Sequence, residues 1–422
     1  MKPYVAYKDS GIEWIGKIPA HWGIRKLKQL GIFTSSGIDK KIAEGEVIVK
    51  MINYTNIYGN KSCILNNNSE YMTVSCSEEK KRTHNIIKGD IVFTPSSETT
   101  EDIGLSALVN EDIQNTVYSY HVIRLRFSEK VNHGYKKYLC NNHFVLNQFS
   151  KCAKGTTRQI LGRNDFKNIQ VLIPLESEQK IIADFLDKKI DIIDSIISKK
   201  EKMIELLKEE RTAVINEAVT KGLNPDNEMK DSGIERIGKI PKEWKVNRLK
   251  MICTFIYGDS LTNEDRISGN IPVYGSNGIV GYHDKAITHK PCIIVGRKGS
   301  YGKINFSDTE CFPIDTTYFI DDRSAKCDLK WLNYALPLLE LDKFSNDTGV
   351  PGLNREYVHN KRIPTPEQWL QKSIAAFLDR ETAKIDTLIA KQERLIEALK
   401  EYRTALISEV VTGKIDVREY AV

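Results

Sequence analysis

The sequence predicts an α+β chain in which two globular mixed α/β domains alternate with two long helices that form an antiparallel coiled coil. An internal repeat is the first observation behind this prediction. A heptad pattern in each copy of the repeat is the second, and glycine-punctuated, strand-like stretches in the remaining sequence are the third. We expect globular domains at 1–172 and 223–364, long helices at 173–222 and 365–414, and a short tail at 415–422.

Two pairs of matching segments define the repeat. Lys8–Trp22 and Lys230–Trp244 are identical at 12 of 15 positions, at an offset of 222. Phe185–Thr220 and Phe377–Thr412 are identical at 20 of 36 positions, at an offset of 192. The stretches between these segments share little sequence. Simple duplication of one domain would explain the constant frame, but the divergence of the inserts favours a frame that fixes geometry and inserts that choose partners.

The second matched pair carries a heptad seam. Apolar side chains recur with the 4–3 spacing of a coiled coil in both copies. The seam positions are Leu186, Ile193, Ile197, Ile204 and Leu207, and in the second copy Leu378, Ile385, Ile389, Ile396 and Leu399. Both copies interrupt the seam at matching places, with Lys200 and Gln392 in the middle and Arg211 and Arg403 near the end. Polar residues of this kind can fix the register of a helix pair.

The ends of the helices are also marked. Gly222 and Gly413 are expected to stop them, and Thr365–Gln368 has the form of a capping box with proline at the first helical position. A helix of roughly 45 residues is ~70 Å long at ~1.5 Å per residue. Antiparallel pairing would give the matched frames equivalent surroundings and place one globular domain at each end. Parallel pairing would place both domains at the same end.

Composition excludes several classes of protein. The net charge of +6 over 422 residues is a mild basic excess that suits an anionic partner without requiring one. The eight cysteines show no zinc-like spacing, so we interpret them as reduced core thiols, and we predict no metal site. The sequence lacks a signal peptide and an apolar run of ~18 residues, so we expect a cytoplasmic protein with no membrane contact.

A glycine-rich loop in the second insert, Gly296–Gly302, is the best candidate for binding an anion. Its glycines let backbone N–H groups approach phosphates, and its cationic side chains add charge and guanine-directed donors. The candidate DNA-binding residues here are Arg297, Lys298, Ser300, Tyr301 and Lys303, with Asn277 and Arg355 on neighbouring turns. The alternative is a glycine-rich hairpin whose charges are merely solvated.

The first insert has different chemistry at the comparable place. Its candidate residues are Ser96, Ser97, Glu98, Thr99 and Thr100, together with Arg158 and Arg163 on turns before the first long helix. An acidic loop would repel phosphates but could accept hydrogen bonds from cytosine amino groups. The arginines suit phosphate contacts, or are simple surface charges. We interpret the strand residues Tyr118, Tyr120, His121 and Tyr318 as packing rather than base contacts.

Catalytic motifs are absent. The sequence Gly302-Lys303-Ile304 does not complete a P-loop, and the glycines of the anion-binding candidate do not fit GxGxxG. The sequence contains no NPPY-like run of an amino-methyltransferase, no HExxH and no GxSxG. We therefore predict binding surfaces and no catalytic residues.

The opening KDSGIEWIGKIPAHW, its second copy and the two FLD…ID…RTA-type helices closely resemble the specificity subunits of type I restriction–modification systems. The resemblance covers essentially the whole chain. It implies that each insert is a target-recognition domain that reads one part of a split DNA sequence. It also implies that the two helices form an antiparallel rod that sets the distance between the parts.

The resemblance also implies partners and cofactors. Two methyltransferase subunits would dock on the rod, and motor–nuclease subunits would complete the endonuclease. S-adenosylmethionine, ATP and magnesium would serve the complex, with no cofactor in this chain. The recognition loop of the first insert departs from the GRKGS form of the second, which leaves its role open. A coiled-coil adaptor that binds only proteins is the alternative function.

Overall fold

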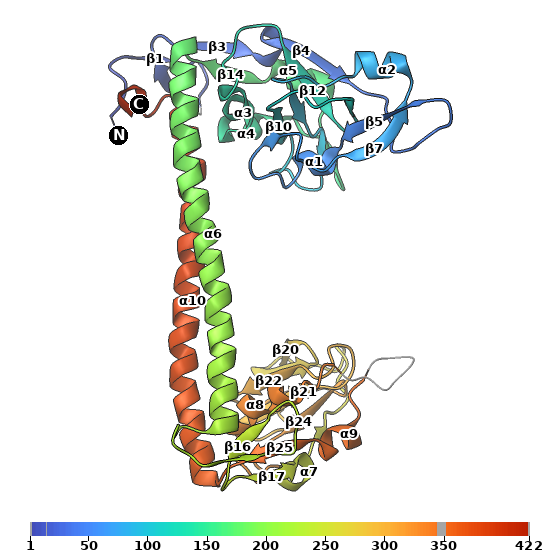
Figure 1. The fold of residues 1–422 in the computed structure, drawn as a ribbon, viewed down its shortest axis with the longest axis vertical. Coiled ribbons are helices and arrows are strands. Elements are labelled where there is room, and N and C mark those ends of the chain that lie inside the picture. Colours follow the sequence, from blue (N-terminus) through green and yellow to red (C-terminus); the bar gives the residue numbers. More distant parts are fainter. Residues whose placement is uncertain (1, 14, 344–351, 421–422) are drawn as a thin grey trace. The chain divides into compact units, whose positions relative to one another are not determined.

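The computed structural model describes residues 2–13, 15–343 and 352–420 (Figure 1). The chain forms two compact units, Met1–Lys199 with Arg394–Val422, and Lys200–Glu393. Each long helix therefore contributes one part to the first unit and the other part to the second. None of the helices in these described ranges combines the length and hydropathy needed to cross a bilayer.

The first unit contains a five-stranded sheet of order β4-β12-β8-β10-β6 and a three-stranded sheet of order β11-β5-β7. The strands of these sheets are β4 Gly31–Ser35, β12 Ile123–Phe127, β8 Ile91–Phe93, β10 Ser106–Val109, β6 Ile64–Leu65, β11 Thr116–Tyr118, β5 Val47–Ile52 and β7 Met72–Cys76. Two-stranded pairs join β1 Tyr7–Asp9 to β2 Lys17–Pro19, β3 Gly23–Lys26 to β14 Gln170–Ile173, and β9 Ser96–Ser97 to β13 Gln159–Ile160. The short helices are η1 Leu27–Gln29, α1 Tyr54–Ile57, α2 Glu78–Thr83, α3 Tyr135–Cys140, α4 His143–Cys152 and α5 Arg163–Asn168.

The second unit contains a four-stranded sheet of order β18-β24-β21-β22 and a three-stranded sheet of order β20-β19-β23. Its strands are β18 Ile256–Tyr257, β24 Thr317–Ile320, β21 Cys292–Gly296, β22 Ile304–Ser307, β20 Gly278–His283, β19 Ile271–Gly275 and β23 Phe312–Pro313. Two-stranded pairs join β15 Met229–Asp231 to β16 Lys239–Pro241, and β17 Lys245–Arg248 to β25 Arg362–Thr365. The short helices are α7 Leu249–Ile252, α8 Leu329–Ala335, η2 Leu336–Leu339 and α9 Arg355–Asn360.

The two inserts share a topology despite their unlike sequences. In the large sheets, β4, β12, β8 and β10 correspond to β18, β24, β21 and β22. In the small sheets, the parallel pair β11 and β5 corresponds to the parallel pair β23 and β19. The first unit adds α1, β6 and α2 between β5 and β8. The predicted fold class, two mixed domains with two long helices, is confirmed.

The long helices are α6 Glu176–Lys221 and α10 Gln368–Val411. Both end where glycine was predicted to stop them, since Gly222 and Gly413 adopt φ of 81° and 71°. The predicted capping box is wrong. Thr365 is the last residue of β25, where it pairs with β17, and its hydroxyl donates to the carbonyl of Ile363. Strand pairing thus uses the residue that was expected to cap α10.

The helices pair antiparallel in each unit, as predicted. In the first unit, Arg403 Nε on α10 lies 3.1 Å from Asp194 Oδ1 on α6. In the second unit, Lys200 Nζ donates to Gln392 Oε1 over 2.9 Å, and Arg211 Nε contacts Asp386 Oδ1 over 2.9 Å. As residue numbers rise along α6, the numbers of their partners fall along α10. The polar residues that interrupt the seam therefore contact side chains of the opposite helix.

The seam positions lie between the paired helices. Buried seam residues are Leu186, Ile193, Ile204, Leu207, Leu378, Ile385 and Ile396, and half-buried ones are Ile197, Ile389 and Leu399. In the first unit the seam continues into the sheet domain through one hydrophobic core that includes Ile193, Leu406 and Phe166. Each sheet domain is therefore packed directly on its stretch of the helix pair.

The matched frames, Lys8–Trp22 and Lys230–Trp244, pack against the C-terminal ends of the long helices. Trp22 and Trp244 are buried, and each lies beside the glycine that ends a long helix. In the first unit, Glu178 on α6 is also buried and accepts hydrogen bonds from Tyr4 Oη over 2.5 Å and Trp22 Nε1 over 3.0 Å. The frame is thus a structural element that anchors the start of each sheet domain to the end of a long helix.

Candidate functional site

The two candidate loops occupy equivalent positions in their units. Each leaves a central strand, β8 or β21, and returns at a glycine with positive φ. The loops are closed by the same backbone hydrogen bond, from Gly104 N to Thr94 O over 3.2 Å and from Gly302 N to Gly296 O over 2.8 Å. An added Cβ would lie 2.3 Å from the backbone of Leu341 at Gly302, so this glycine is required for close approach as well as for φ.

Each loop lies against the arginine-bearing segment that precedes a short helix. In the second unit, Leu353 N donates to Arg297 O over 2.8 Å, two residues before Arg355. In the first unit, Ser96–Ser97 pairs with Gln159–Ile160, next to Arg158. The structure therefore brings together loop and arginine candidates that are 58 residues apart in the second unit and 61–62 residues apart in the first.

In the second unit, the two candidate arginines meet at one aromatic ring. The guanidinium carbons of Arg297 and Arg355 lie 5.2 Å and 4.7 Å from the ring centroid of Tyr257. Arg297 is held further by two hydrogen bonds, from Nε and Nη2, to the carbonyl of Asp315. Tyr257 was missed by the sequence analysis, and its ring is exposed on β18, the edge strand of the large sheet.

The other candidates on and beside this loop are Lys298, Ser300, Tyr301, Lys303 and Asn277. Lys303 Nζ donates to the carbonyl and the side-chain Oδ1 of Asn277, on the turn between β19 and β20. Lys298 and Ser300 are exposed, whereas Tyr301 is half-buried and packs against the hydrophobic core of the unit. Tyr301 is therefore placed for packing, whereas Lys298, Ser300 and Lys303 lie on the surface.

Among the described residues, the cations of this surface have no neutralising carboxylates. Within residues 2–13, 15–343 and 352–420, no ion pair joins Arg297, Lys298, Lys303 or Arg355 to an acidic side chain. Most surface cations contribute to mixed-sign surroundings, and a cluster of unpaired cations generates a local positive potential. We call these four residues the basic surface of the second unit.

The corresponding surface of the first unit is acidic. Asp102 Oδ2 accepts hydrogen bonds from Thr99 Oγ1 over 3.1 Å and from Tyr58 Oη over 3.3 Å, and the Asp102 charge raises the pKa of Tyr58. Glu98 is exposed and Thr100 half-exposed, while Ser97 is buried and accepts from Thr99 N. This loop presents hydrogen-bond acceptors where the second unit presents donors.

The other candidates of the first unit are a serine and two cations. Ser96 is half-buried in β9, and Arg158 and Arg163 are exposed, the latter as the first residue of α5. Among the tyrosines interpreted as strand packing, Tyr118 and Tyr318 are fully or almost fully buried, which confirms that interpretation. It is wrong for Tyr120, whose side chain is 48% exposed because it follows β11 on a turn.

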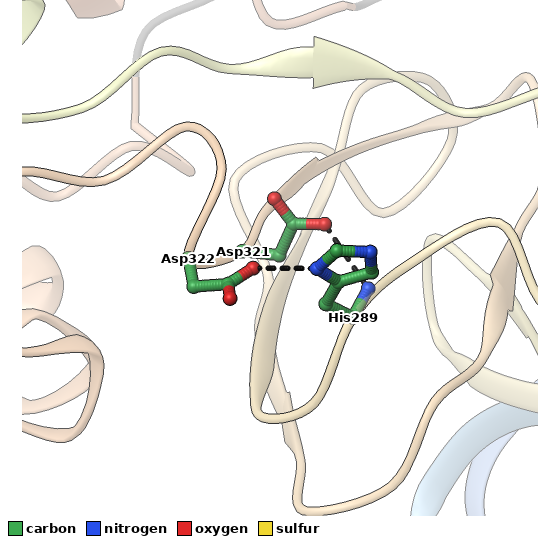
Figure 2. Close-up of side chains that lie close together, drawn as sticks. All are labelled: His289, Asp321 and Asp322. Atoms are coloured by element: carbon green, nitrogen blue, oxygen red, sulfur yellow. Dashed lines mark hydrogen bonds and ion pairs between the residues drawn. The ribbon is translucent and has the colours of Figure 1, made fainter.

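A cluster of potential metal ligands lies in the second unit, made of His289, Asp321 and Asp322 (Figure 2). His289 Nδ1 lies 2.9 Å from Asp322 Oδ1, and His289 N donates to Asp321 Oδ2. The buried carboxylate of Asp321 is already paired with the Arg323 guanidinium, which lowers the pKa of Asp321 against the opposing effect of burial. Because the Arg323 guanidinium compensates the charge of Asp321, this cluster does not need a metal ion to balance its charge.

Known specificity subunits of type I restriction systems are similar to this chain in sequence. The family model for the type I restriction modification DNA specificity domain matches residues 19–206 and 241–398, which include both inserts and parts of both long helices. The MjaX specificity subunit of Methanocaldococcus jannaschii is 23% identical over 424 residues, covering 96% of each chain. The EcoKI specificity subunit of Escherichia coli is 24% identical over 189 residues, covering 44% of this chain and 40% of that one.

Solved structures share the fold. A chain from work on complex assembly and conformational transition of the type I R-M system superimposes with a TM-score of 0.72 at 17% identity, covering 94% of this chain and 99% of that chain. The HsdS subunit from Thermoanaerobacter tengcongensis superimposes with a TM-score of 0.55 at 16% identity, covering 96% of this chain and all of that chain. With its repeated frame, paired helices and matching inserts, the chain belongs to the family of type I restriction–modification specificity subunits.

Proposed function

We propose that each unit reads one half of a bipartite DNA target and that this chain supplies recognition rather than catalysis. One observation carries the proposal. Two inserts of unlike sequence fold with the same topology, and at the same place they present loops of opposite chemistry. A symmetric scaffold with unlike contact surfaces suits a target whose two halves differ in sequence.

The chemistry of the two surfaces suggests how they would differ. Arginine and lysine donate to phosphate oxygens and to the O6 and N7 acceptors of guanine, so the basic surface suits backbone contacts and guanine. Carboxylate and hydroxyl acceptors suit the amino group of cytosine, and Glu98 and Thr99 are exposed for this role. Arg158 and Arg163 would add phosphate contacts in the first unit.

The long helices would set the spacing of the target. At ~1.5 Å per residue, the 46 residues of α6 are ~70 Å long. This length equals ~20 base pairs at ~3.4 Å each, so two reading domains joined by it can address grooves about one helical turn apart or more. A helix pair with a fixed register would keep that spacing constant.

The outer face of the helix pair is a candidate docking surface for methyltransferase subunits. Ile196 and Met203 on α6 are 38% and 49% exposed, and their repeat equivalents Leu388 and Leu395 on α10 are 46% and 39% exposed. Exposed apolar side chains at heptad spacing are typical of a helix face that binds a protein partner. Because the repeat presents the face twice, we propose that two copies of one methyltransferase bind it.

The remaining activities would belong to the partners. We propose that methyltransferase subunits bring S-adenosylmethionine, and that motor–nuclease subunits bring the ATP and magnesium chemistry of the endonuclease. A coiled-coil adaptor that binds only proteins would need neither the basic nor the acidic surface.

A selection from random duplex DNA tests the proposed function. The full chain, alone and with a co-expressed methyltransferase, is incubated with a random duplex library, and the bound fraction is sequenced. The expected result is a two-part motif with a constant gap. Methylated adenines in cells with and without the chain should fall within the same motif. Methyltransferase binding without any enriched sequence would instead establish the adaptor.

A further inference from the structure

Tyr257 holds an unusual position on the basic surface. It lies on the edge strand β18 with its side chain 45% exposed, and in β-sheet register it lies opposite Tyr318 on β24. The two rings are 5.0 Å apart between centroids. Tyr318 is itself 2% exposed, and its hydroxyl donates to the carbonyl of Leu353 over 2.9 Å. The exposed ring of Tyr257 thus packs against the ring of Tyr318, which is buried and hydrogen-bonded.

Two arginines from segments far apart in the sequence lie over the ring of Tyr257. Arg297 comes from the loop after β21, and Arg355 is the first residue of α9, 58 positions later; both guanidinium groups lie over this one ring. A guanidinium over an aromatic face is attracted to the ring, but two guanidinium groups over one ring repel each other. In the part of the chain that the structure describes, no carboxylate pairs with either group to relieve this repulsion. A bound anion would relieve it.

The hydrogen-bond donors that remain also fit an anion. Arg297 directs Nε and Nη2 to the Asp315 carbonyl, which fixes the guanidinium and leaves its Nη1 donors available. Arg355 forms no hydrogen bond through its guanidinium with the described residues. Guanidinium groups bind phosphate oxygens strongly because their planar donors match two oxygens at once.

We propose that Arg297 and Arg355 form a paired-arginine site for one phosphodiester of DNA, and that Tyr257 is the positioning residue that holds them. The proposal rests on the proposed DNA-reading function and goes further, because it assigns a phosphate rather than a base to these two arginines. Tyr257 itself acts through the arginines.

The first unit lacks this arrangement. Val295 pairs with Tyr318 and is followed by the loop-closing Gly296, just as Phe93 pairs with Ile123 and is followed by the loop-closing Thr94. The residue opposite Ile123 on β4 is Ser35, which therefore corresponds to Tyr257. A serine has no ring over which arginines could lie, so loss of Tyr257 should affect contacts to one half of the target only.

The test compares Tyr257→Phe with Tyr257→Leu in the full chain. The probe is the duplex that the wild-type chain selects from the random library, and the measurement is affinity at several salt concentrations. Phenylalanine keeps the ring and should retain binding. Leucine removes the ring and should weaken binding about tenfold, the size expected for losing one charge-assisted contact. The slope of log K against log[salt] should become shallower by ~0.9, the value for one phosphate.

Two sets of variants complete the design. The double variant Arg297→Ala/Arg355→Ala should reduce the slope by ~0.9, and neither single variant should reduce it by more than this, since both arginines share one phosphate. Tyr282→Leu is the matched control, because Tyr282 is 56% exposed in the same unit and should keep the wild-type slope. Circular dichroism and retained selection of the first half of the motif show that each variant is folded.

The outcomes are distinct. If Tyr257→Leu binds with wild-type affinity and slope, the paired-arginine site is wrong. If it keeps the slope but relaxes one base position in the second half of the motif, the arginines read a base and the phosphate assignment is wrong. If the wild-type chain and its methyltransferase complex select no DNA at all, the proposed function itself fails, and the inference fails with it.

Discussion

The polar pair in the middle of the helix seam offers a direct test of how the register is set. Lys200 Nζ donates to Gln392 Oε1 over 2.9 Å, and the two residues are repeat equivalents at the offset of 192. Gln392 is 9% exposed and Lys200 is half-buried. The apolar seam positions on either side would pack almost as well if one helix slid by a heptad. Such a slide would separate the ammonium group from its only acceptor across the seam.

The expected energies follow from burial. Gln392→Leu leaves the Lys200 ammonium group half-buried without its acceptor, which costs ~1–3 kcal/mol. Lys200→Leu leaves a buried amide unsatisfied, at a similar or slightly smaller cost. The double variant removes both polar groups and adds apolar contact, so it should be as stable as wild type or more stable. The coupling energy between the two sites should therefore be ~2–6 kcal/mol in the direction that favours the double variant.

Hydrogen exchange of the helix centres is the appropriate assay, because a chain of two units need not unfold in one step. Exchange in peptides around 195–205 and 387–397 should accelerate in each single variant and return to wild-type rates in the double variant. The double variant should also lose uniqueness of register, seen as several products when engineered cysteines on the two helices are cross-linked. A double variant that exchanges faster than either single variant would refute the reasoning.

Three further predictions follow from other contacts. Glu178→Leu should destabilise the first unit by ~2–3 kcal/mol, because the buried hydroxyl of Tyr4 and the indole of Trp22 lose their acceptor. This loss of stability should appear as faster proteolysis near the N-terminus, and an unchanged cleavage rate would contradict the prediction. Gly413→Ala should lower the melting temperature more than Gly222→Ala. Both substitutions put alanine in an unfavourable backbone conformation with positive φ. The clash is closer at position 413, where the new Cβ would lie 2.3 Å from Pro19, than at position 222, where it would lie 3.1 Å from Trp244. Arg297→Ala should weaken DNA binding through loss of a phosphate contact while the base preferences in the first half of the motif stay unchanged, and relaxed preferences in that first half would count against separate reading units.

The helix pair was predictable because its signal is local. A heptad seam depends on residues three and four apart, and both copies show the same phase, so the partner of each helix was evident. The matching interruptions at Lys200 and Gln392 were recognised as residues that can fix the register, and the structure shows that they contact each other. The start of α10 was not predictable in this way. Thr365 has the right residue type for a cap, but its pairing with β17, about 120 residues earlier, determines its backbone.

The candidate DNA-binding surfaces were only partly predictable. The glycine-rich loop was found because its composition is distinctive, and the acidic loop because it occupies the comparable sequence position. Tyr257 carries no local signal, since an isolated tyrosine in a short strand is typical of packing. Its role depends on Arg297 and Arg355, which reach it only after the large sheet and α9 are assembled. Glu178 was missed for a related reason, because a carboxylate in the first turn of a helix is usually solvated, and its partner Tyr4 is 174 residues away.

The two inserts make equivalent hydrogen bonds to the long helices although their sequences differ. In the first unit, Tyr138 on α3 donates to Asp187 on α6; in the second unit, Tyr334 on α8 donates to Asp379 on α10 over 2.9 Å. The two aspartates are related by the repeat offset of 192, although their tyrosine partners lie in inserts of unlike sequence. This contact between insert and helix is thus the same in both units, while the loops after β8 and β21 differ in chemistry. Loop chemistry can therefore vary while this contact is kept.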